Sequence, residues 1–600
     1  MSTPTVVFLA PAGLCALSWA GAGLAIPRRA LSGDALLDAL TRVAAGSLVV
    51  SLVLFALGRA GLFDRGALVG LTAALALAGA LGLLARRRRV ALPRDRIVLA
   101  LLVAAGIALV LDLVASTAPP TSADALKYHL ALPKLWLQLG SVGDSFWRWE
   151  SFNPSSIELL YAQGLALGGD STAGAIHAVL TVACAAAVYG LGRELAAGNA
   201  LAGAAAAFLF VLEGLVTWEA TSAFVELGLT FYAVLAVWHA VRWSRSGATS
   251  SAGWTGALAG AAAGTKYLGL LAAAVLLGIF GVVALVRRRP AHLALAGGAA
   301  LAAGGAWYLK NAVVTGNPVY PLYFGGKWLT PFADRAVSAF DTAYGVHGGV
   351  LRLPILPVDL LVHGGAFDRG EYVGTAIFAG AVLALFTCRT PQVLALLAGA
   401  VLYLIAWDVQ SPQARFLLPA LAVLAPAAGA GIAPLLCAGR ARRAAILAVF
   451  AAVGAVWLAS SAALTRQLLP VTVGAESRAA FVERLTGTYD AFVAARARTA
   501  GTVALAGYPL SYHFPGRAIQ IGVPEFVPTL SRREYLARLR SHGVDDILVA
   551  EPPRRLPELA PVRGCLTRVA AFRARFVTSR SRGTSTPLEL RLYSLARCRS

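Results

Sequence analysis

Residues 116–161 read STAPPTSADALKYHLALPKLWLQLGSVGDSFWRWESFNPSSIELLY and interrupt a chain made mainly of Ala, Leu, Val and Gly. One apolar segment, 97–114, precedes this stretch, and another, 173–191, follows it. The stretch contains a carboxylate, a Tyr-His pair, several Pro and a cluster of Trp. Trp rings favour the boundary between membrane and water. The stretch therefore predicts a large loop that lies on a bilayer and carries the chemistry.

Residues 124–139 are predicted to form a short amphipathic helix inside this loop. Apolar residues at 126, 130, 133 and 137 recur on one side at helical spacing. Asp124 and Tyr128 lie one turn apart on another side. Residues 155–168 are too short and too polar for a span, so they predict a juxtamembrane or re-entrant helix that closes the loop.

The composition excludes a soluble globular protein. Of the 600 residues, 58% are hydrophobic and 14% are charged, whereas ordinary domains carry about 25% charged residues. Apolar runs of about 20 residues recur, each long enough to cross a hydrocarbon core of roughly 30 Å. The predicted fold class is a polytopic α-helical membrane protein with about 13–14 transmembrane helices. The expected spans lie near 6–26, 44–62, 66–85, 97–115, 172–192, 198–217, 222–242, 253–264, 267–286, 291–313, 373–387, 392–407, 414–436 and 444–464.

The net charge of +22 does not indicate nucleic-acid binding, because the basic residues gather between apolar segments and in the tail. Arginine-rich turns of this kind mark cytoplasmic loops and also suit anionic lipid headgroups. The clusters are Arg28–Arg29, Arg86–Arg89, Arg193, Arg242–Arg245, Arg287–Arg289 and Arg440–Arg443. This pattern predicts an outside N-terminus and outside loops at about 116–170 and 315–372. It also places the tail from 475 onward outside.

The tail, 475–600, is predicted to be a small α/β domain. GTVALAGY (501–508) and DDILVAEP (545–552) resemble buried strands, and LELRLYSL (588–595) is a last alternating strand. SRREYLARLRSHG (531–543) indicates an amphipathic helix that ends at a glycine. The tail contains no nucleotide-binding loop and no catalytic triad.

The six cysteines show no zinc-site spacing. Four lie in or beside apolar segments, where a thiol usually packs as a small hydrophobe. Cys565 and Cys598 share the tail; one opens CLTRVAAF and the other follows the last strand. Antiparallel neighbouring segments would bring these two together as a disulfide, and two free thiols are the alternative.

Polar residues at the predicted outer ends of the helices define the candidate site. An acid with several cations at one membrane face suits an anionic lipid-linked substrate, because the cations hold a phosphate and the carboxylate acts as a base. The candidates are Asp124 as catalytic residue and Tyr128, His129, Glu226, Lys266, Tyr267, Lys310, Asn311 and Arg415 as substrate-binding residues. No metal ligand is assigned.

Each candidate also has a purely structural explanation. Lysine and arginine at helix ends often snorkel to the interface. Glu226 suits the N-terminus of a helix, where the dipole favours a carboxylate. His129 suits packing or a hydrogen bond more than metal binding. Asp124, an isolated acid just after a Pro-Pro turn, is the candidate for which a catalytic role is favoured.

The order of these pieces resembles the GT-C superfamily of membrane glycosyltransferases, which use polyprenyl-phosphate sugars and include protein O-mannosyltransferases and lipid A aminoarabinose transferases. The resemblance covers about 97–465, after extra N-terminal helices in 1–96. It rests on SADALKYHLALPKLWLQLG (122–140), AFVELGLTF (223–231), AGTKYLGLL (263–271), KNAVVTGNPVYP (310–321) and ARFLLPALAVLAP (414–426). The chain differs from better-known members by its three preceding spans and by Asp-Ala in place of an Asp-Glu pair.

This resemblance implies a glycosyltransferase of a bacterial cytoplasmic membrane. Asp124 would deprotonate a hydroxyl of a lipid, glycan or protein acceptor on the extracytoplasmic face, with inversion at the sugar. Lys266 and Arg415, with Lys310, would steady the leaving lipid phosphate, and Glu226 would bind sugar hydroxyls or assist the base. No cofactor is assigned, and a divalent metal stays open because the second acid is missing. The expected partners are the polyprenyl-phosphate sugar and membrane lipid, without nucleic acid.

Two other functional classes remain as alternatives. A transporter or flippase of lipid-linked saccharides would carry charges near the membrane midplane, broken helices and two repeating halves. The sequence instead has charges at outer helix ends and no clear repeat. A membrane scaffold whose tail binds a partner has no use for an acid and several cations at one face.

Overall fold

The computed structural model describes most of the chain, and its gaps fall mainly in loops. The described residues are 3–85, 93–143, 149–327, 344–346, 350–368, 373–437, 439–508, 510–521, 531–552, 555–579 and 584–598. The arginine cluster at 86–89, which contributes to the predicted topology, lies outside these ranges.

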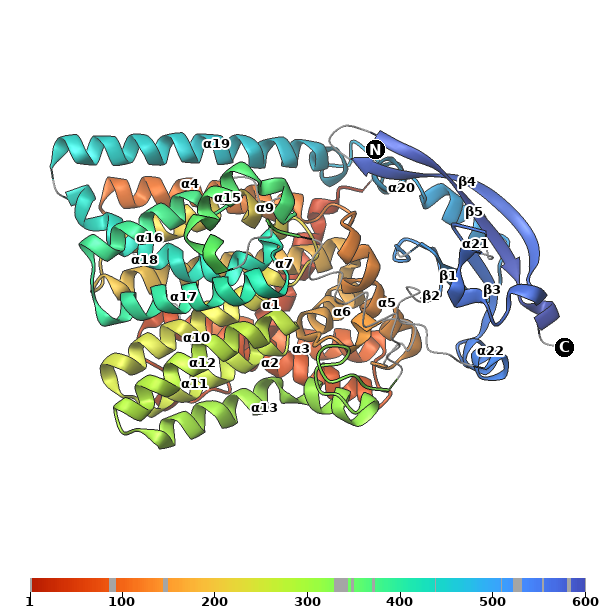
Figure 1. Cartoon of the computed structure of the whole chain (residues 1–600), viewed down its shortest axis with the longest axis horizontal. Helices are drawn as coiled ribbons and strands as arrows, with labels where there is room; N and C mark the ends of the chain where they lie inside the picture. Colours follow the sequence, from red (N-terminus) through yellow and green to blue (C-terminus); the bar gives the residue numbers. More distant parts are fainter. Residues whose placement is uncertain are drawn as a thin grey trace.

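Long helices lie side by side along the longest axis of the molecule, and a small sheet lies at one end (Figure 1). The helices are α1 (Leu9–Gly23), α2 (Ala35–Arg59), α3 (Arg65–Ala85), α4 (Arg96–Ala115), α5 (Ala131–Leu139), α6 (Ser156–Gly168), α7 (Asp170–Leu195), α8 (Ala200–Val211), α9 (Gly214–Ala220), α10 (Glu226–Ser246), α11 (Thr249–Ala263), α12 (Tyr267–Val286), α13 (Pro290–Thr315), α15 (Leu356–Val362), α16 (Thr375–Thr387), α17 (Pro391–Gln410), α18 (Leu418–Cys437), α19 (Arg440–Thr472), α20 (Arg478–Thr486), α21 (Tyr489–Arg496) and α22 (Arg532–Ser541). The strands are β1 (Thr502–Ala506), β2 (Ala518–Gln520), β3 (Val544–Val549), β4 (Thr567–Ser579) and β5 (Thr584–Ser594).

The predicted polytopic helical membrane fold is confirmed. Within the described ranges, 9 helices are long and apolar enough to cross a membrane, or 10 if the bent pair α8–α9 counts as one span. Each predicted span corresponds to a helix, although α10, α11, α13 and α16 do not meet the same test of length and apolarity.

Small residues let the helix backbones approach closely. A Cβ atom built on Gly46 of α2 would lie 1.7 Å from the carbonyl oxygen of Trp19 in α1. One built on Gly256 of α11 would lie 1.9 Å from the carbonyl oxygen of Ala296 in α13. Hydrocarbon supplies no hydrophobic drive for helices to associate, so close van der Waals contact of this kind holds membrane helices together.

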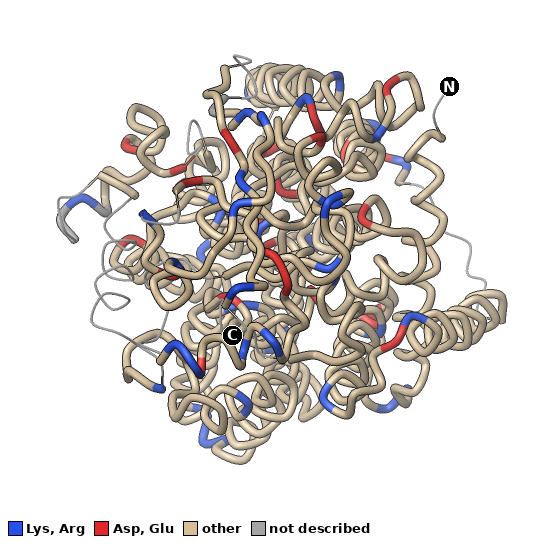
Figure 2. The backbone as a smooth tube through the Cα atoms, turned by 90° about the vertical axis from the view of Figure 1, so that its right-hand side faces the viewer, with Lys and Arg blue, Asp and Glu red and all other residues tan. Residues whose placement is uncertain are grey.

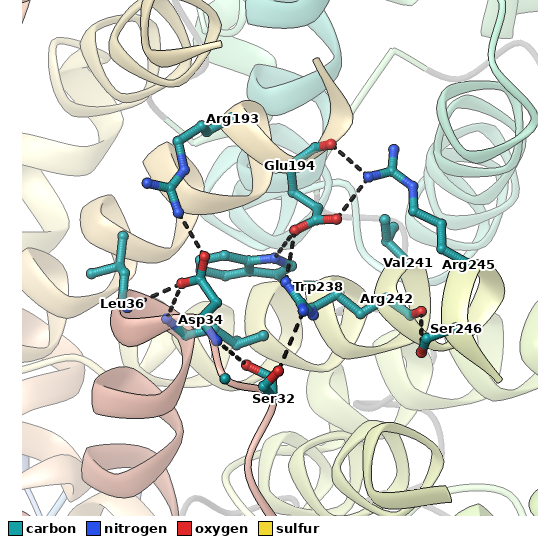
Figure 3. A network of polar contacts seen from close by, with 12 residues as sticks. Ser32, Asp34, Leu36, Arg193, Glu194, Trp238, Val241, Arg242, Arg245 and Ser246 are labelled. Atoms are coloured by element: carbon teal, nitrogen blue, oxygen red, sulfur yellow. Dashed lines mark hydrogen bonds and ion pairs between the residues drawn. The ribbon is translucent and has the colours of Figure 1, made fainter. Parts of the chain in front are cut away.

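Polar side chains join the start of α2 to the ends of α7 and α10 (Figure 3). Arg193 Nη2, near the end of α7, lies 2.7 Å from Asp34 Oδ2 at the start of α2. The next residue, Glu194, binds Arg242 at 3.2 Å and Arg245 at 2.7 Å, both from the end of α10. These helix ends are predicted to share one side of the membrane, and the structure brings them together.

The helix predicted at 124–139 is not continuous. Residues Ala125–His129 form a π-helical turn, and α5 begins only at Ala131. Pro133 explains the break, because its ring would clash with the carbonyl of His129 if the α-helix continued upstream. The wider turn moves that carbonyl away while Tyr128 and Asp124 still meet, with the phenol donating to Oδ2 at 3.4 Å.

The span predicted at 198–217 is also broken. α8 ends at Val211 and α9 starts at Gly214, with a bend of 67° between them. Glu213 at the break has extended backbone dihedral angles, and its buried carboxylate accepts a hydrogen bond from the amide of Gly374. The bend directs α9 across the end of the bundle that holds Asp124.

The tail forms the predicted small α/β domain. Its five strands make one sheet in the order β2-β1-β3-β5-β4, parallel among the first three and antiparallel among the last three. The predicted strands correspond to β1, β3 and β5, and the predicted helix to α22, which begins with a Ser531–Glu534 capping box. β2 has only 3 residues, too few for an alternating pattern to predict.

The disulfide between Cys565 and Cys598 is confirmed, with the two Cα atoms 5.0 Å apart. The antiparallel pairing of β4 with β5 places Thr567 opposite Ser594. The cysteines lie just before β4 and just after β5, so this pairing brings them to the same edge of the sheet.

The tail docks on the loop that contains the π-helical turn. Lys134 of α5 donates to the carbonyls of Tyr512 and Phe514, both at 2.8 Å. The amide of Tyr512 donates to the carbonyl of Leu126 at 3.3 Å, and His513 Nε2 donates to that of Pro120 at 2.7 Å. Figure 2 looks onto this end of the molecule, where acidic and basic residues are interspersed.

Candidate active site

Asp124 lies directly against Arg415. The carboxylate Oδ2 is 2.7 Å from Arg415 Nη1, and the guanidinium also donates from Nη2 to Gln413 Oε1 at 3.0 Å. The Asp124 side chain precedes the π-helical turn, and Arg415 comes from the 3-10 turn that opens α18. Asp124 is 23% exposed and Arg415 is 10% exposed, so the pair is sheltered but reachable.

Glu226 and Lys266 form a second ion pair beside the first. Lys266 Nζ lies 2.7 Å from Glu226 Oε1, which is wholly buried at the start of α10. The two cations share one ring: Lys266 Nζ lies 4.8 Å and the Arg415 guanidinium 5.0 Å from the centroid of Phe416. Phe224 lies on the other side of Arg415, with its centroid 5.4 Å away. The two pairs therefore form one cluster of alternating charge.

The charges of this cluster act on Asp124 in opposition to its burial. Burial disfavours the ionised carboxylate, but the nearby Arg415 and Lys266 outweigh it and lower the pKa of Asp124 to about 2. Asp124 is therefore ionised at neutral pH and can accept a proton. While it is paired with Arg415, however, it is a weak base.

His129 binds an acid outside this ion-pair cluster. Its Nδ1 lies 2.8 Å from Glu158 Oε1 of α6, and the ring is wholly buried against Tyr128 and Phe224. His129 therefore makes a buried hydrogen bond with Glu158, and its role in substrate binding stays a prediction.

Tyr267, Lys310 and Asn311 form a second network that holds the backbone at 151–152. Lys310 Nζ donates to the carbonyl of Ser151 at 3.1 Å. Asn311 Nδ2 donates to the carbonyl of Phe152 at 2.7 Å and to Tyr267 Oη at 3.0 Å. A role of these three in substrate binding stays a prediction, because the contacts described above are with the protein itself.

Sequence reasoning missed three acids of the site. Glu219 of α9 is wholly buried, and Glu158 pairs with His129. Glu150 lies 2.6 Å from Lys127, on the turn that follows Asp124. The sequence feature that could have indicated them is an acid in an otherwise apolar or aromatic stretch, as in WEATSAFVE for Glu219. Such an acid needs a nearby partner, and the sequence does not show which partner the fold provides.

An apolar groove lies between α10, α12, α17 and α18, and the four charged residues of the ion-pair cluster do not belong to its lining. Its volume is about 190 Å³, and its lining includes Val237, Leu276, Ile279, Leu396 and Ala420. Pro419, one turn after Arg415, and Tyr403 belong to its wall. The Tyr403 hydroxyl donates to the carbonyl of Phe416 at 2.8 Å, which ties the groove to the ring shared by the two cations.

The part of the chain that the structure describes contains no cluster of metal-ligating side chains. There, no three His, Cys, Asp or Glu side chains lie close enough to hold a metal ion together. Asp124 and Glu226 each bind a cationic side chain instead.

The overall fold matches solved membrane glycosyltransferase structures. ArnT from Cupriavidus metallidurans bound to undecaprenyl phosphate aligns with a TM-score of 0.51 at 15% identity, over 81% of this chain and 97% of that chain. The chain has the GT-C fold. The apo state of the same ArnT matches this GT-C fold with a TM-score of 0.50 at the same identity and coverage.

A third GT-C structure aligns less well. The oligosaccharyltransferase from Archaeoglobus fulgidus, in the apo form, matches at 14% identity over 75% of this chain and 69% of that chain. Its TM-score of 0.38 is too low to carry an argument. No protein-family model matches this chain, and no curated protein sequence does.

Proposed function

We propose that the chain is a membrane glycosyltransferase that moves a sugar from a polyprenyl-phosphate donor to an acceptor hydroxyl. The observation that carries this proposal is the ion-pair cluster of Asp124, Arg415, Glu226 and Lys266, which a hydrogen bond from Tyr403 to Phe416 connects to the wall of an apolar groove. A polyprenyl phosphate has the same two parts, an anion and a long apolar chain. The fold shared with an ArnT bound to undecaprenyl phosphate supports this donor class.

In the proposed reaction Asp124 takes the proton of the acceptor hydroxyl. The hydroxyl oxygen attacks the anomeric carbon from the face opposite the phosphate, so that the configuration inverts. The bond between that carbon and the phosphate oxygen breaks, and both of its electrons leave with the polyprenyl phosphate. Arg415 and Lys266 stabilise the charge that develops on the leaving phosphate, where electrostatic catalysis contributes most.

The ion pair between Asp124 and Arg415 makes the basicity of Asp124 depend on whether the donor is bound. When the donor phosphate takes hydrogen bonds from Arg415, the guanidinium charge is shared between two anions. The field that depresses the pKa of Asp124 then weakens, because the added phosphate is negative. Asp124 becomes a stronger base at the stage when an acceptor must be deprotonated.

The active site is proposed to face the extracytoplasmic side. The helix ends joined by Asp34, Arg193 and Arg242 carry the arginine pattern of cytoplasmic loops, and the ion-pair cluster lies at the other end of the bundle with the tail. A cytoplasmic membrane with an extracytoplasmic active site and tail is therefore the proposed location.

The test uses the full chain in lipid nanodiscs with a panel of undecaprenyl-phosphate sugars, each carrying labelled sugar, and host membranes as acceptor source. Asp124→Asn should lower transfer at least about a hundredfold, because the shape is kept and the base is lost. Asp490→Asn, an exposed acid on α21, is the matched control and should keep full transfer. Near-normal transfer by Asp124→Asn would reject the role of Asp124, and no transfer of any sugar by the parent chain would reject the panel's donor class.

A flippase of lipid-linked saccharides is the second candidate, and the broken helix pair α8–α9 favours it. A flippase moves the intact donor between leaflets and leaves the sugar on its lipid phosphate. Proteoliposomes with fluorescent polyprenyl-phosphate sugar separate the two functions. Movement between leaflets without sugar release would support the flippase.

A further inference from the structure

A second cavity lies beside the ion-pair cluster, between α9, α19 and the tail domain. Its volume is about 710 Å³, in the upper part of the range of about 300–1,000 Å³ found for small-molecule sites. One wall is formed by residues 118–122 and by Ala125, which lead into the π-helical turn. We infer that this cavity binds the acceptor, and that the acceptor is a neutral saccharide of more than one sugar ring. This inference rests on the proposed function.

The lining of the cavity suits carbohydrate. It presents hydroxyl groups from three elements, an amide and two indole rings, among apolar side chains. The polar and aromatic members are Thr121, Ser122, Thr221, Ser222, Ser460, Gln467, Trp218 and Trp457. Hydroxyls and amides exchange hydrogen bonds with sugar hydroxyls, and the flat apolar faces of Trp pack against the C–H face of a sugar ring.

The same lining disfavours a charged acceptor. Within the described ranges, no Lys, Arg, Asp or Glu lines the cavity. An acceptor with a phosphate or carboxylate inside this cavity would lose water without gaining a counter-charge, which is costly. The ion-pair cluster proposed to bind the donor has the opposite character, because it contains the cations Arg415 and Lys266. The two cavities are thus built for different halves of the reaction.

The position of the cavity fits an acceptor that attacks near Asp124. Ser122 lies two residues before Asp124 and shares a hydrogen bond of 3.0 Å with Ser222, so the wall is joined to the loop before Glu226. The Trp218 ring meets Phe224 edge-on at 5.3 Å, and Phe224 lies against Arg415. Through these contacts the wall of the cavity is connected to the ion-pair cluster.

Helix α19 and the tail complete the cavity. Trp457, Ser460, Leu464 and Gln467 recur at helical spacing and present one face of α19 to it. Leu485 of α20 and Val577 of β4 close it from the tail. The tail thereby has a defined role, as part of the acceptor site.

The test fills the cavity and leaves the ion-pair cluster intact. Ser460→Trp adds a large ring on the cavity face of α19. Ala459→Trp adds the same ring one position away, on an exposed residue outside the lining, and is the matched control. Because both positions are exposed, neither change removes a buried contact.

The readout is saturation-transfer-difference NMR of the chain in nanodiscs. The probes are neutral di- to tetrasaccharides of glucose, mannose, galactose and arabinose, with oligogalacturonates of equal length for comparison. We expect a neutral saccharide signal with the parent chain and Ala459→Trp, and at least a tenfold smaller signal with Ser460→Trp. Equal signals in the two Trp variants, a stronger galacturonate signal, or no neutral saccharide signal from the parent chain would each overturn the inference.

Native mass spectrometry with undecaprenyl phosphate separates this inference from the proposed function. Ser460→Trp should bind this lipid as the parent chain does, because the apolar groove and Arg415 are unchanged. If Ser460→Trp reduced both lipid binding and saccharide binding, the inference of an acceptor cavity separate from the donor site would be overturned. If the parent chain binds a neutral saccharide but not undecaprenyl phosphate, the result would contradict the proposed donor and would support the acceptor cavity.

Discussion

Arg415 is the residue on which the electrostatics of the site depend. It binds Asp124 directly and lies over both Phe224 and Phe416. Its planar guanidinium can hold Asp124 and a phosphate at the same time through different N–H groups, whereas a lysine presents a single compact charge. Loss of this one side chain should therefore affect both donor binding and the base.

We expect Arg415→Gln and Lys266→Gln to weaken binding of undecaprenyl phosphate by about tenfold or more each, since each loses a charge-assisted contact. Arg415→Lys should also bind the lipid less well, because the bidentate fork is lost. Lipid titration followed by native mass spectrometry measures this, with saccharide binding as the control that should not change. If both Gln variants bound the lipid as tightly as the parent chain, Arg415 and Lys266 would not bind the donor phosphate. They would then be interpreted as side chains that snorkel to the membrane interface.

The pH dependence of kcat/KM tests the pairing of Asp124 with Arg415. Because its pKa is held at about 2, Asp124 stays ionised across the working range and gives the parent chain no acid limb above pH 4. Arg415→Gln removes the largest stabilising charge while burial remains, so the pKa should rise toward or above the ordinary value of about 3.9. The acid limb of Arg415→Gln should then appear between about pH 4 and 6. A limb unchanged from that of the parent would contradict the pairing.

At this scale the sequence identified residue types but not partners. Asp124, Glu226, Lys266 and Arg415 were predictable because each is a charge in an apolar surrounding at a predicted helix end. Their arrangement as two ion pairs around Phe416 was not, since α10, α12 and α18 meet only in the folded chain. The hydrogen bond between Glu158 and His129 was not predictable for the same reason, because it depends on how α6 packs.

At the scale of elements, Pro133 and the tail determine how the π-helical turn after Asp124 is held. The proline interrupts the helix predicted at 124–139, a feature that residue spacing alone did not reveal because the apolar positions keep helical periodicity. The turn is then fixed from outside by the segment 511–517 of the tail. Contacts between residues hundreds of positions apart leave no local signal in the sequence.

Lys134→Met should loosen this turn. Burial lowers the pKa of Lys134 to about 8, so it is mostly charged at pH 7 and donates to two carbonyls of the tail. Hydrogen bonds to charged groups contribute about 1.5–3 kcal/mol. We expect faster hydrogen exchange at 120–138 and at least a fivefold loss of transfer. Arg533→Met, on the exposed side of α22, is the control. Unchanged exchange at 120–138 would show that the tail does not hold the turn.

At the scale of the whole molecule, the arginine pattern predicted correctly which helix ends lie together. Asp34, Arg193 and Arg242 meet at one end of the bundle, and Thr5 lies 3.4 Å from Thr117 at the other, so the N-terminus shares an end with the loop that holds Asp124. Apolar runs and the arginine-rich turns between them can be read directly along the sequence. They were therefore sufficient to predict the order and direction of the spans. Which end faces the cytoplasm is a property of the cell, and it requires an experiment.

Native cysteines make that experiment possible. Cys437 is exposed and Cys388 partly exposed at the arginine-rich end, Cys15 and Cys184 are buried, and Cys565 and Cys598 are bonded to each other. If the tail is extracytoplasmic, a membrane-impermeant maleimide should not label the parent chain in intact spheroplasts. It should label Cys437 after the membrane is permeabilised. Asp490→Cys, at an exposed position of α21, should be labelled in both conditions. Mass spectrometry of non-reduced peptides should recover the peptide pair joined through Cys565 and Cys598. Labelling of Cys437 in intact spheroplasts, with Asp490→Cys protected, would reverse the orientation and place the active site on the cytoplasmic side.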